Sequence, residues 1–234
     1  MSQPPRKETI SSRISALLRE SILRGDLAPG AKINLDRLRA AHDVSISPLR
    51  EAVSRLVSDG LVEFEDQRGY RVTPVSLDNL AEVTRLRTEL EALALDASIQ
   101  TGDLEWESDV MRALYRLNRT ERDGTRPETI EAWEAAHTDF HLSLIRGCNM
   151  PLLLHFCTIL HNMNDRYRRL YLARSPSGRD VQAEHEAIAH AATSRRLDEA
   201  RDLLRAHIAR TGQNLQAQLG SALPADRKIW QDEH

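Results

Sequence analysis

Four histidines are spaced so that their imidazole rings could bind one metal ion. His137 and His141 are four residues apart in a segment with helical periodicity, residues 128–146, so both rings project from one helix face. His185 and His207 lie 22 positions apart, which suits two antiparallel helices joined by a tight turn. Neutral imidazole is a common ligand of zinc. The spacing predicts a shared metal site, although each histidine alone is more often a surface or hydrogen-bonded core residue.

A second pattern, His185-Glu186 followed by His190, resembles the HExxH motif of zinc proteases but departs from its spacing. The motif needs histidines four residues apart, whereas these are five apart. At about 100° per residue they lie roughly 140° apart around a helix and do not share a face. With no clear nucleophile and no established general base, we expect no enzymatic activity. A metal-dependent enzyme using the histidine cluster remains the alternative.

Two arginines are candidates for binding a carboxylate. Arg87 lies four residues before Glu91 and either forms a surface ion pair, worth about a few tenths of a kcal/mol, or points inward, where its planar guanidinium suits a carboxylate ligand. Arg166 is a pocket candidate within a basic and aromatic cluster expected on a solvated or dimer-facing surface: Arg166, Tyr167, Arg168, Arg169 and Tyr171. His155 and His161 are interpreted as structural. Trp106 and Trp133 are interpreted as too isolated to form an aromatic cage. Asp139, two positions from His141, is expected to point elsewhere.

The elements that must position these residues are helical. Residues 77–218 show almost no strand-like alternation, and the turn signals predict six helices with breaks near residues 102, 124–127, 149–151, 175–178 and 193–195. Two of these helices have apolar stripes expected to face the core: Leu80, Val83, Leu86, Leu90 and Leu93 in the first, and Leu197, Ala200, Leu203, Leu204 and Ile208 in the last. Short connections favour an all-α antiparallel bundle that can enclose a ligand or metal.

The first 75 residues carry a different pattern. Apolar spacing predicts helices over residues 10–23 and 35–41. A third helix begins near Ser45 or Ser47, either of which can cap it, and it ends at Gly60, which readily takes positive φ. Strand signals at residues 61–64 and 69–72, around a turn at 65–68, complete a winged helix-turn-helix.

The third helix has an apolar face and a polar face. Its inward stripe is Leu49, Val53, Leu56 and Val57, which leaves a polar face free to meet the major groove of DNA. The candidate DNA contacts on this helix are Ser45, Ser47, Arg50 and Arg55, and those on the wing are Arg68, Gly69 and Arg71. The alternative is a small helical domain that merely carries solvated arginines.

Composition separates the two halves and restricts the class of protein. Residues 1–75 hold 12 basic and 10 acidic side chains, and the rest hold 20 basic and 25 acidic, so the protein does not coat DNA nonspecifically. We expect a DNA-binding domain at residues 1–75, an effector-binding and dimerisation domain at 76–219, and a loosely ordered tail at 220–234. Only Cys148 and Cys157 are present, and no apolar run approaches the roughly 20 residues of a membrane span, so a cytoplasmic protein without membrane contact is expected.

Four segments of the N-terminal half resemble the DNA-binding domain of the GntR superfamily of bacterial regulators: GDLAPG, VSISPLREAV, DGLV and RGYRV. They occur in the family's order and spacing. The resemblance implies DNA contacts from Ser47, Arg50 and the wing residues Arg68, Gly69 and Arg71. Ile46 departs from the pattern, because many members carry an arginine there.

Residues 77–219 resemble the FCD domain, the helical effector domain of the FadR branch of that superfamily. The resemblance implies a divalent cation held by an aspartate and a histidine four residues apart, followed by two further histidines. Here His141 matches the first histidine and His137 stands at the aspartate position. Replacing a carboxylate with a neutral imidazole favours zinc, or nickel, over manganese and magnesium. RTELE at residues 87–91 resembles the R-x-x-L-E signature of the first effector-domain helix.

These resemblances predict a DNA-binding transcription regulator. We expect a homodimeric repressor that binds a palindromic operator and is released by a small organic acid. GDLEWESDV and HTDFHLSLIRGC resemble CsiR-like repressors of dicarboxylate or γ-aminobutyrate use, and repressors of aromatic-acid breakdown share the fold. A DNA-binding architectural protein with a purely structural metal is a further alternative.

Overall fold

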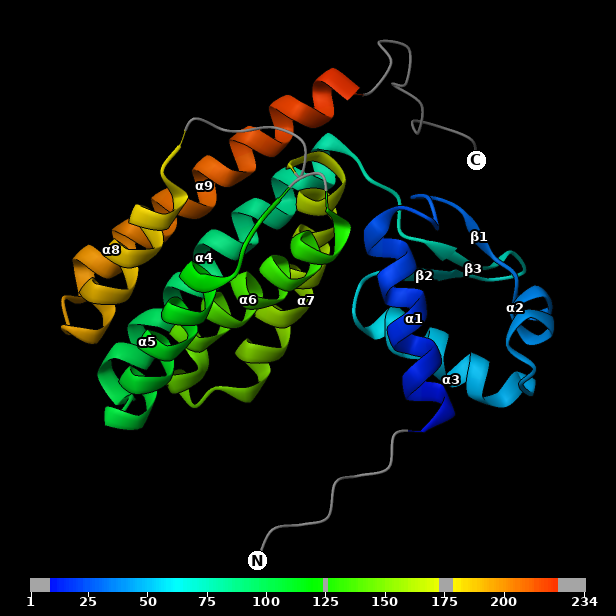
Figure 1. The fold of residues 1–234 in the computed structure, drawn as a ribbon, viewed down its shortest axis with the longest axis horizontal. Coiled ribbons are helices and arrows are strands. Elements are labelled where there is room, and N and C mark those ends of the chain that lie inside the picture. The colour runs from blue at the N-terminus through cyan, green and yellow to red at the C-terminus, as the bar shows by residue number, and fades with distance from the viewer. Residues whose placement is uncertain (1–8, 124–125, 173–178, 223–234) are drawn as a thin grey trace, which may run out of the picture. The chain divides into compact units, whose positions relative to one another are not determined.

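The structure, a computed structural model, describes residues 9–123, 126–172 and 179–222 (Figure 1). The chain divides into two compact units, residues 1–75 and 76–234. No helix in the described ranges combines the length and apolar character needed to cross a bilayer.

The N-terminal unit contains helices packed on a small antiparallel sheet with strand order β1-β3-β2. Its elements are α1 (Ile10–Arg24), β1 (Lys32–Ile33), α2 (Leu35–His42), α3 (Ile46–Ser58), β2 (Val62–Glu65) and β3 (Gly69–Val72). The buried stripe of α3 packs against α1, and both helices contribute to one apolar core with the first residues of the wing. The winged helix-turn-helix expected from the sequence is therefore the observed fold.

Two details of helix α3 and of the wing differ from expectation. Ser45 is the N-cap residue of α3, but its side chain makes no capping hydrogen bond. The sheet has a third strand, because Lys32 pairs with Arg71 and Ile33 with Tyr70. Two residues are too few to show alternation, so only the pairing reveals β1. Gly60 has φ of 73°, as predicted for the residue that ends α3.

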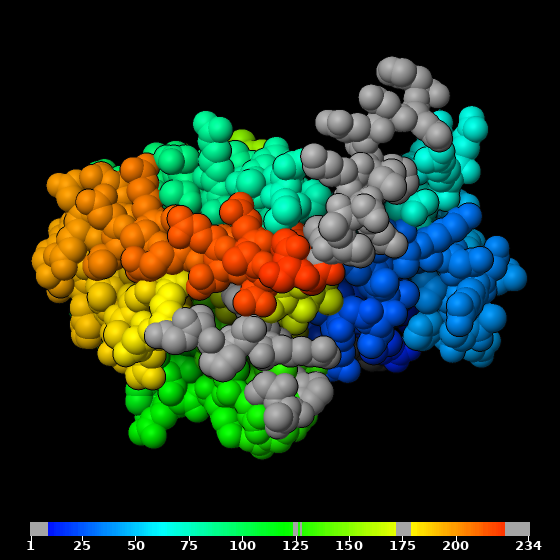
Figure 2. Space-filling model, turned by 90° about the horizontal axis from the view of Figure 1, so that it is seen from above, coloured from blue at the N-terminus to red at the C-terminus, as the bar shows by residue number. Residues whose placement is uncertain are grey.

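The second unit is a helical bundle whose described part contains the six expected long helices. These are α4 (Leu77–Thr101), α5 (Leu104–Arg119), α6 (Pro127–Ile145), α7 (Pro151–Tyr167), α8 (Val181–Thr193) and α9 (Leu197–Ala222). A 3-10 turn (Arg146–Cys148) precedes α7, and a π-helical turn (Arg168–Leu172) follows it. Helix α4 packs against α6, α7 and α9, and Figure 2 shows α9 lying along α4 and α8 at the surface.

Three expectations about the bundle need correction or lie outside the described residues. Leu86 and Leu93, expected in the core, are 41% and 52% exposed, because α4 instead turns Arg87 and Glu91 inward. The tail does not begin at Gly220, since α9 continues to Ala222; residues 223–234 are not described. Of the predicted breaks, residues 124–125 and 175–178 also lie outside the described ranges.

Candidate functional site

The four predicted histidines meet inside the helical unit. His137 and His141 project from α6, His185 from α8 and His207 from α9, and each is at most 3% exposed. One ring nitrogen from each lies within 4.8 Å of the others. Ring centroids are 4.5 Å apart for His137 and His141 and 4.7 Å apart for His185 and His207.

The hairpin of α8 and α9 brings the second pair of histidines together. Its turn contains Arg195 at φ of 59°, a left-handed backbone conformation. The Arg195 guanidinium donates to the carbonyl of Gly102 at 2.8 Å and to Glu107 at 2.9 Å, which ties the turn to α5 and the end of α4. Antiparallel packing then places His185 and His207 side by side, as their separation predicted.

The ring nitrogens of the cluster need a ligand. Four buried ring nitrogens of the cluster have no hydrogen-bond partner among the described residues: His137 Nε2, His141 Nδ1, His141 Nε2 and His185 Nε2. Leaving one buried polar group unpaired costs about 1–3 kcal/mol. Burial, with the nearby positive charge of Arg168 or of the other histidines, lowers the pKa of His137, His141 and His185 well below 6.5. Neutral imidazoles with free lone pairs fit a divalent metal ion.

His207 has a carboxylate partner outside the cluster. Its Nδ1 lies 2.9 Å from Glu184 Oε2. Burial lowers the pKa of His207 to about 4, although Glu184 opposes that shift. Glu184 is also paired with Arg179 and Arg210. Neither Glu184 nor Arg179 was singled out from the sequence, although Glu184 directly precedes a predicted ligand.

Arg87 lies beside the cluster and points inward, and its ion pair with Glu91 is buried instead of lying on the surface. It is 3% exposed and points into the bundle, yet its Nε donates to Glu91 at 2.6 Å. Burial opposes ionisation of Glu91, but Arg87 and His161 outweigh it and lower its pKa to about 2. Glu91, His141 and His161 form a second group with metal-ligand spacing, but Arg87 Nη2 already lies 3.4 Å from both Glu91 Oε2 and His161 Nε2. The Arg87 guanidinium therefore already supplies the positive charge at this second group.

Three residues of the basic and aromatic cluster at the end of α7, Arg166, Tyr167 and Arg168, are buried, contrary to expectation. Arg166 is fully buried, and Arg168 is 6% exposed because it makes a two-point ion pair with the buried Glu134. Trp133 is not isolated either: it stacks on His137 with centroids 4.9 Å apart and lies under the Arg168 guanidinium. The contacts of Arg168 with α6 are long-range and have no signature in the sequence, whereas Trp133 and His137 are four residues apart on one helix.

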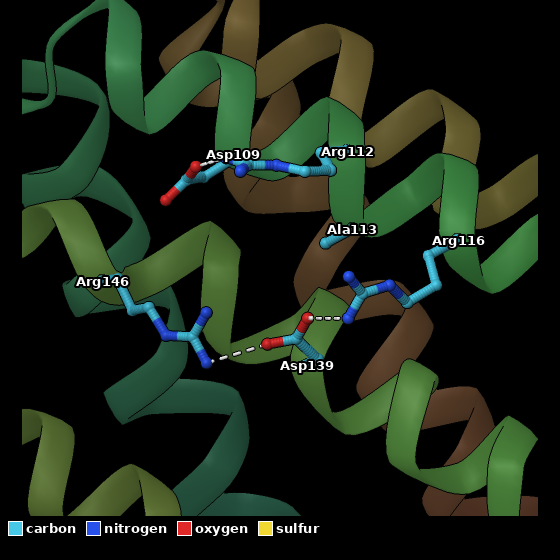
Figure 3. Close-up of a pocket in the computed structure, with 6 residues that line it drawn as sticks. All are labelled: Asp109, Arg112, Ala113, Arg116, Asp139 and Arg146. Carbon is cyan, nitrogen blue, oxygen red and sulfur yellow. Dashed lines mark hydrogen bonds and ion pairs between the residues drawn. The ribbon is translucent and has the colours of Figure 1, made fainter. Parts of the chain in front are cut away.

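Asp139 points away from the histidines, as predicted. It lines a surface hollow between α5 and α6 (Figure 3), and the volume of that hollow is about 190 Å³. Its carboxylate accepts from Arg146 at 2.9 Å and lies 3.9 Å from Arg116. Asp139 is therefore not a substitute for the carboxylate missing from the metal-ligand pattern.

The predicted DNA-binding residues of α3 lie on its exposed side. Ser45, Ser47, Arg50 and Arg55 are all exposed. Within the described residues, Arg50 has no hydrogen-bond or ion-pair partner, whereas Arg55 contacts Glu51 at 2.6 Å and Ser12 at 2.9 Å. Ile46, the departure from the family pattern, packs against the core of the unit.

The two wing arginines differ in exposure and in their contacts within the N-terminal unit. The Arg68 side chain is 75% exposed, with one long contact of 3.4 Å to Glu65. Arg71 donates to the carbonyl of Gly30 at 2.8 Å and is less exposed. Gly69 has φ of 83°, which favours glycine at the start of β3. Arg50 and Arg68 are thus the most available cations of the predicted set.

A winged helix-turn-helix joined to a ligand-binding helical bundle defines a class of DNA-binding transcription regulators. Residues 10–72 match the family described as bacterial regulatory proteins, gntR family, and residues 82–210 match the FCD domain. The chain belongs to the GntR family of transcription regulators, in the group that carries an FCD domain.

Relatives with known names support the same assignment. The chain is 38% identical over 195 residues to the HTH-type transcriptional regulator BphR of Paraburkholderia xenovorans, covering 82% of this chain and 79% of that protein. It is 30% identical over 195 residues to the HTH-type transcriptional repressor GlaR of Escherichia coli, covering 82% and 89%. The solved structure of E. coli McbR has the same fold, with a TM-score of 0.73, 22% identity and coverage of 91% and 99%. BphR and GlaR are similar to this chain in sequence across both domains, and McbR is similar in fold. BphR is named as a transcriptional regulator and GlaR as a transcriptional repressor.

Proposed function

We propose that this protein is a homodimeric repressor, acting on operator DNA in the cytoplasm, that is released when a small organic acid binds beside a metal ion in its helical domain. The observation that carries the proposal is the buried cluster of four neutral histidines, three of which have unpaired ring nitrogens, in a chain that also has a winged helix-turn-helix. One relative of similar length, GlaR, is named as a repressor.

DNA recognition is assigned to the exposed polar face of α3 and to the wing. Arg50 is suited to a base edge, because its guanidinium is exposed and unengaged within the described residues. Ser45, Ser47 and Arg55 are exposed as well, and Arg68, Gly69 and Arg71 on the wing are assigned to phosphate and groove contacts. A second copy would double these contacts on a palindromic operator.

The metal ligands in this proposal are His137, His141, His185 and His207, with zinc as the ion and nickel as the second choice. A bound divalent cation would supply a Lewis-acid site for the carboxylate of an effector. Arg87 and Arg166, both buried in the same domain, are the candidates for a second contact with that acid. Arg87 is held in place for this role by Glu91.

The test is a titration of purified protein against its own upstream DNA, with a panel of organic acids and with metal content measured in parallel. We expect saturable, sequence-specific binding that one acid weakens by about 5- to 150-fold, the usual range of coupling between two sites. The same acid should lose its effect after chelation of the metal. DNA affinity that ignores every acid would favour the architectural protein, and turnover of an acid would favour the metal-dependent enzyme.

A further inference from the structure

Helix α8 provides two adjacent residues that contact different parts of the histidine cluster. His185 belongs to the cluster itself. Glu184, the residue before it, reaches across to α9, where its Oε2 lies 2.9 Å from Nδ1 of His207. His207 is 2% exposed, so water cannot readily replace this contact. Glu184 therefore acts on the cluster through another residue and is not one of the four proposed ligands.

The contact decides which nitrogen of His207 carries the proton. Glu184 is paired with the guanidinium groups of Arg179 and Arg210, so its carboxylate is ionised and can only accept hydrogen bonds. Nδ1 of His207 must then be the donor. A neutral imidazole has a single N–H, so the lone pair lies on Nε2.

Arg179 holds the carboxylate in position. Its Nε donates to Glu184 Oε1 at 2.6 Å, and its Nη1 donates to the hydroxyl of Thr211 at 3.1 Å. Arg179 Nη2 also lies 3.1 Å from His207 Nδ1. A guanidinium nitrogen can only donate, and the two N–H groups of Nη2 have acceptors in the Glu184 carboxylate and in the His207 carbonyl oxygen, which is 3.2 Å away. By contrast, Glu91 Oε2 is 3.9 Å from His141 Nδ1, which is too long for a hydrogen bond.

We propose that Glu184 is a positioning residue of the metal site, which fixes His207 as the Nδ1–H tautomer and presents Nε2 as the ligand atom. The inference rests on the proposed metal centre. Carboxylates that orient a metal-binding histidine in this way change metal affinity by about 10- to 100-fold when removed.

The experiment compares full-length wild-type protein with the E184A, E184Q and E186Q variants. Glu186 is a matched control on the same helix, where it contacts Asn118 and Gln182 instead of a clustered histidine. Zinc affinity is measured by competition with a chromophoric chelator. The tautomer of His207 is read in the metal-free proteins from the ring nitrogen chemical shifts of ¹⁵N-histidine-labelled samples, and thermal unfolding of each metal-free variant reports whether it folds.

We expect E184A to weaken zinc binding by about 10- to 100-fold and to shift His207 away from the Nδ1–H tautomer. E184Q, whose amide oxygen still accepts from Nδ1, should have a smaller effect on both, and E186Q should match wild type. Unchanged zinc affinity and an unchanged tautomer in E184A and E184Q would overturn this inference alone. If the wild-type protein binds no zinc, the metal centre of the proposed function is wrong, and this inference fails with it.

Discussion

Helix α3 exposes its proposed functional side chains to solvent, whereas helix α6 buries its own inside the bundle. In α3 the apolar residues Leu49, Val53 and Leu56 are buried, and Arg50 is left exposed. In α6 the histidines are themselves buried, at positions 137 and 141. The apolar stripe of α3 therefore predicts its proposed DNA-binding face directly, whereas the proposed role of α6 depends on which helices pack against it.

The two regions also differ in what their polar groups require. Water solvates an exposed guanidinium such as that of Arg50 at little cost. Buried imidazole nitrogens are shielded from bulk solvent, and each one left unpaired costs about 1–3 kcal/mol. The interior site should consequently be more sensitive to substitution and to pH than the exposed one. Four predictions test this comparison.

The largest effect is expected from His141→Ala. His141 is a proposed ligand with two unpaired ring nitrogens at the centre of the cluster. Its loss should weaken zinc binding by more than about 100-fold, the upper range for residues that only orient a ligand. Chelator competition measures the change, with His155→Ala on exposed α7 surface as the control. Wild-type zinc affinity in the His141 variant would remove this residue from the ligand set.

Arg50→Ala should act on the exterior site only. Loss of a bidentate base contact is expected to weaken specific operator binding by about 10- to 100-fold while zinc affinity stays unchanged. Fluorescence anisotropy with operator and unrelated DNA measures the difference. Arg112→Ala, an exposed arginine of the helical unit, is the control. Equal losses on both DNAs would show that Arg50 contacts phosphate and not a base.

Acid should destabilise the metal-free protein through the buried histidines. The folded-state pKa of His207, about 4, lies below the ordinary 6.5, so the unfolded chain binds its proton more readily, and stability is lost as the pH falls from 7 towards 4. This residue alone should cost on the order of 2 kcal/mol at pH 5.

The pH effect is measured as a difference between wild type and His207→Gln by urea unfolding at pH 7.5, 6 and 5. Asp165, whose pKa burial raises to about 7, has the opposite effect on stability in this window, but it is common to both proteins. We expect the stability gap between the two proteins to narrow by about 2 kcal/mol as the pH falls. A constant gap would mean that the pKa of His207 is the same in the folded and unfolded chains.

The smallest effect is expected for Arg68→Ala on the wing. A highly exposed arginine that contacts phosphate should weaken binding to all DNA sequences similarly and reduce the slope of log affinity against log salt by about 1. Affinity measured between low and physiological salt gives that slope. Arg71→Ala provides the comparison, because Arg71 is already engaged by the Gly30 carbonyl. A change confined to the operator would assign Arg68 to base readout.

The structure differs from the sequence predictions where the packing of separate elements decides the outcome. The strand at Lys32–Ile33 is too short to carry a periodic signal and exists because β3 pairs with it. Leu86 and Leu93 were expected inside because an apolar stripe normally faces the core, but Arg87 and Glu91 occupy the inward positions as a pair. Arg168 was expected at the surface, yet Glu134 and Trp133 from α6 enclose it.

The sequence by itself determined the order of helices, the wing, the polar face of α3 and the spacing that lets two histidine pairs share a site. These properties are periodic or local, so a side chain's position along the chain sets its direction. Only the tertiary structure decided that Glu184 contacts His207, that Arg87 is both inward and paired, and that Trp133 stacks on His137. The contact between Glu184 and His207 joins two helices, and the burial of Arg87 depends on which helices surround α4. The packing of the bundle decides both, whereas the four-residue spacings of Arg87–Glu91 and Trp133–His137 only make those pairs possible.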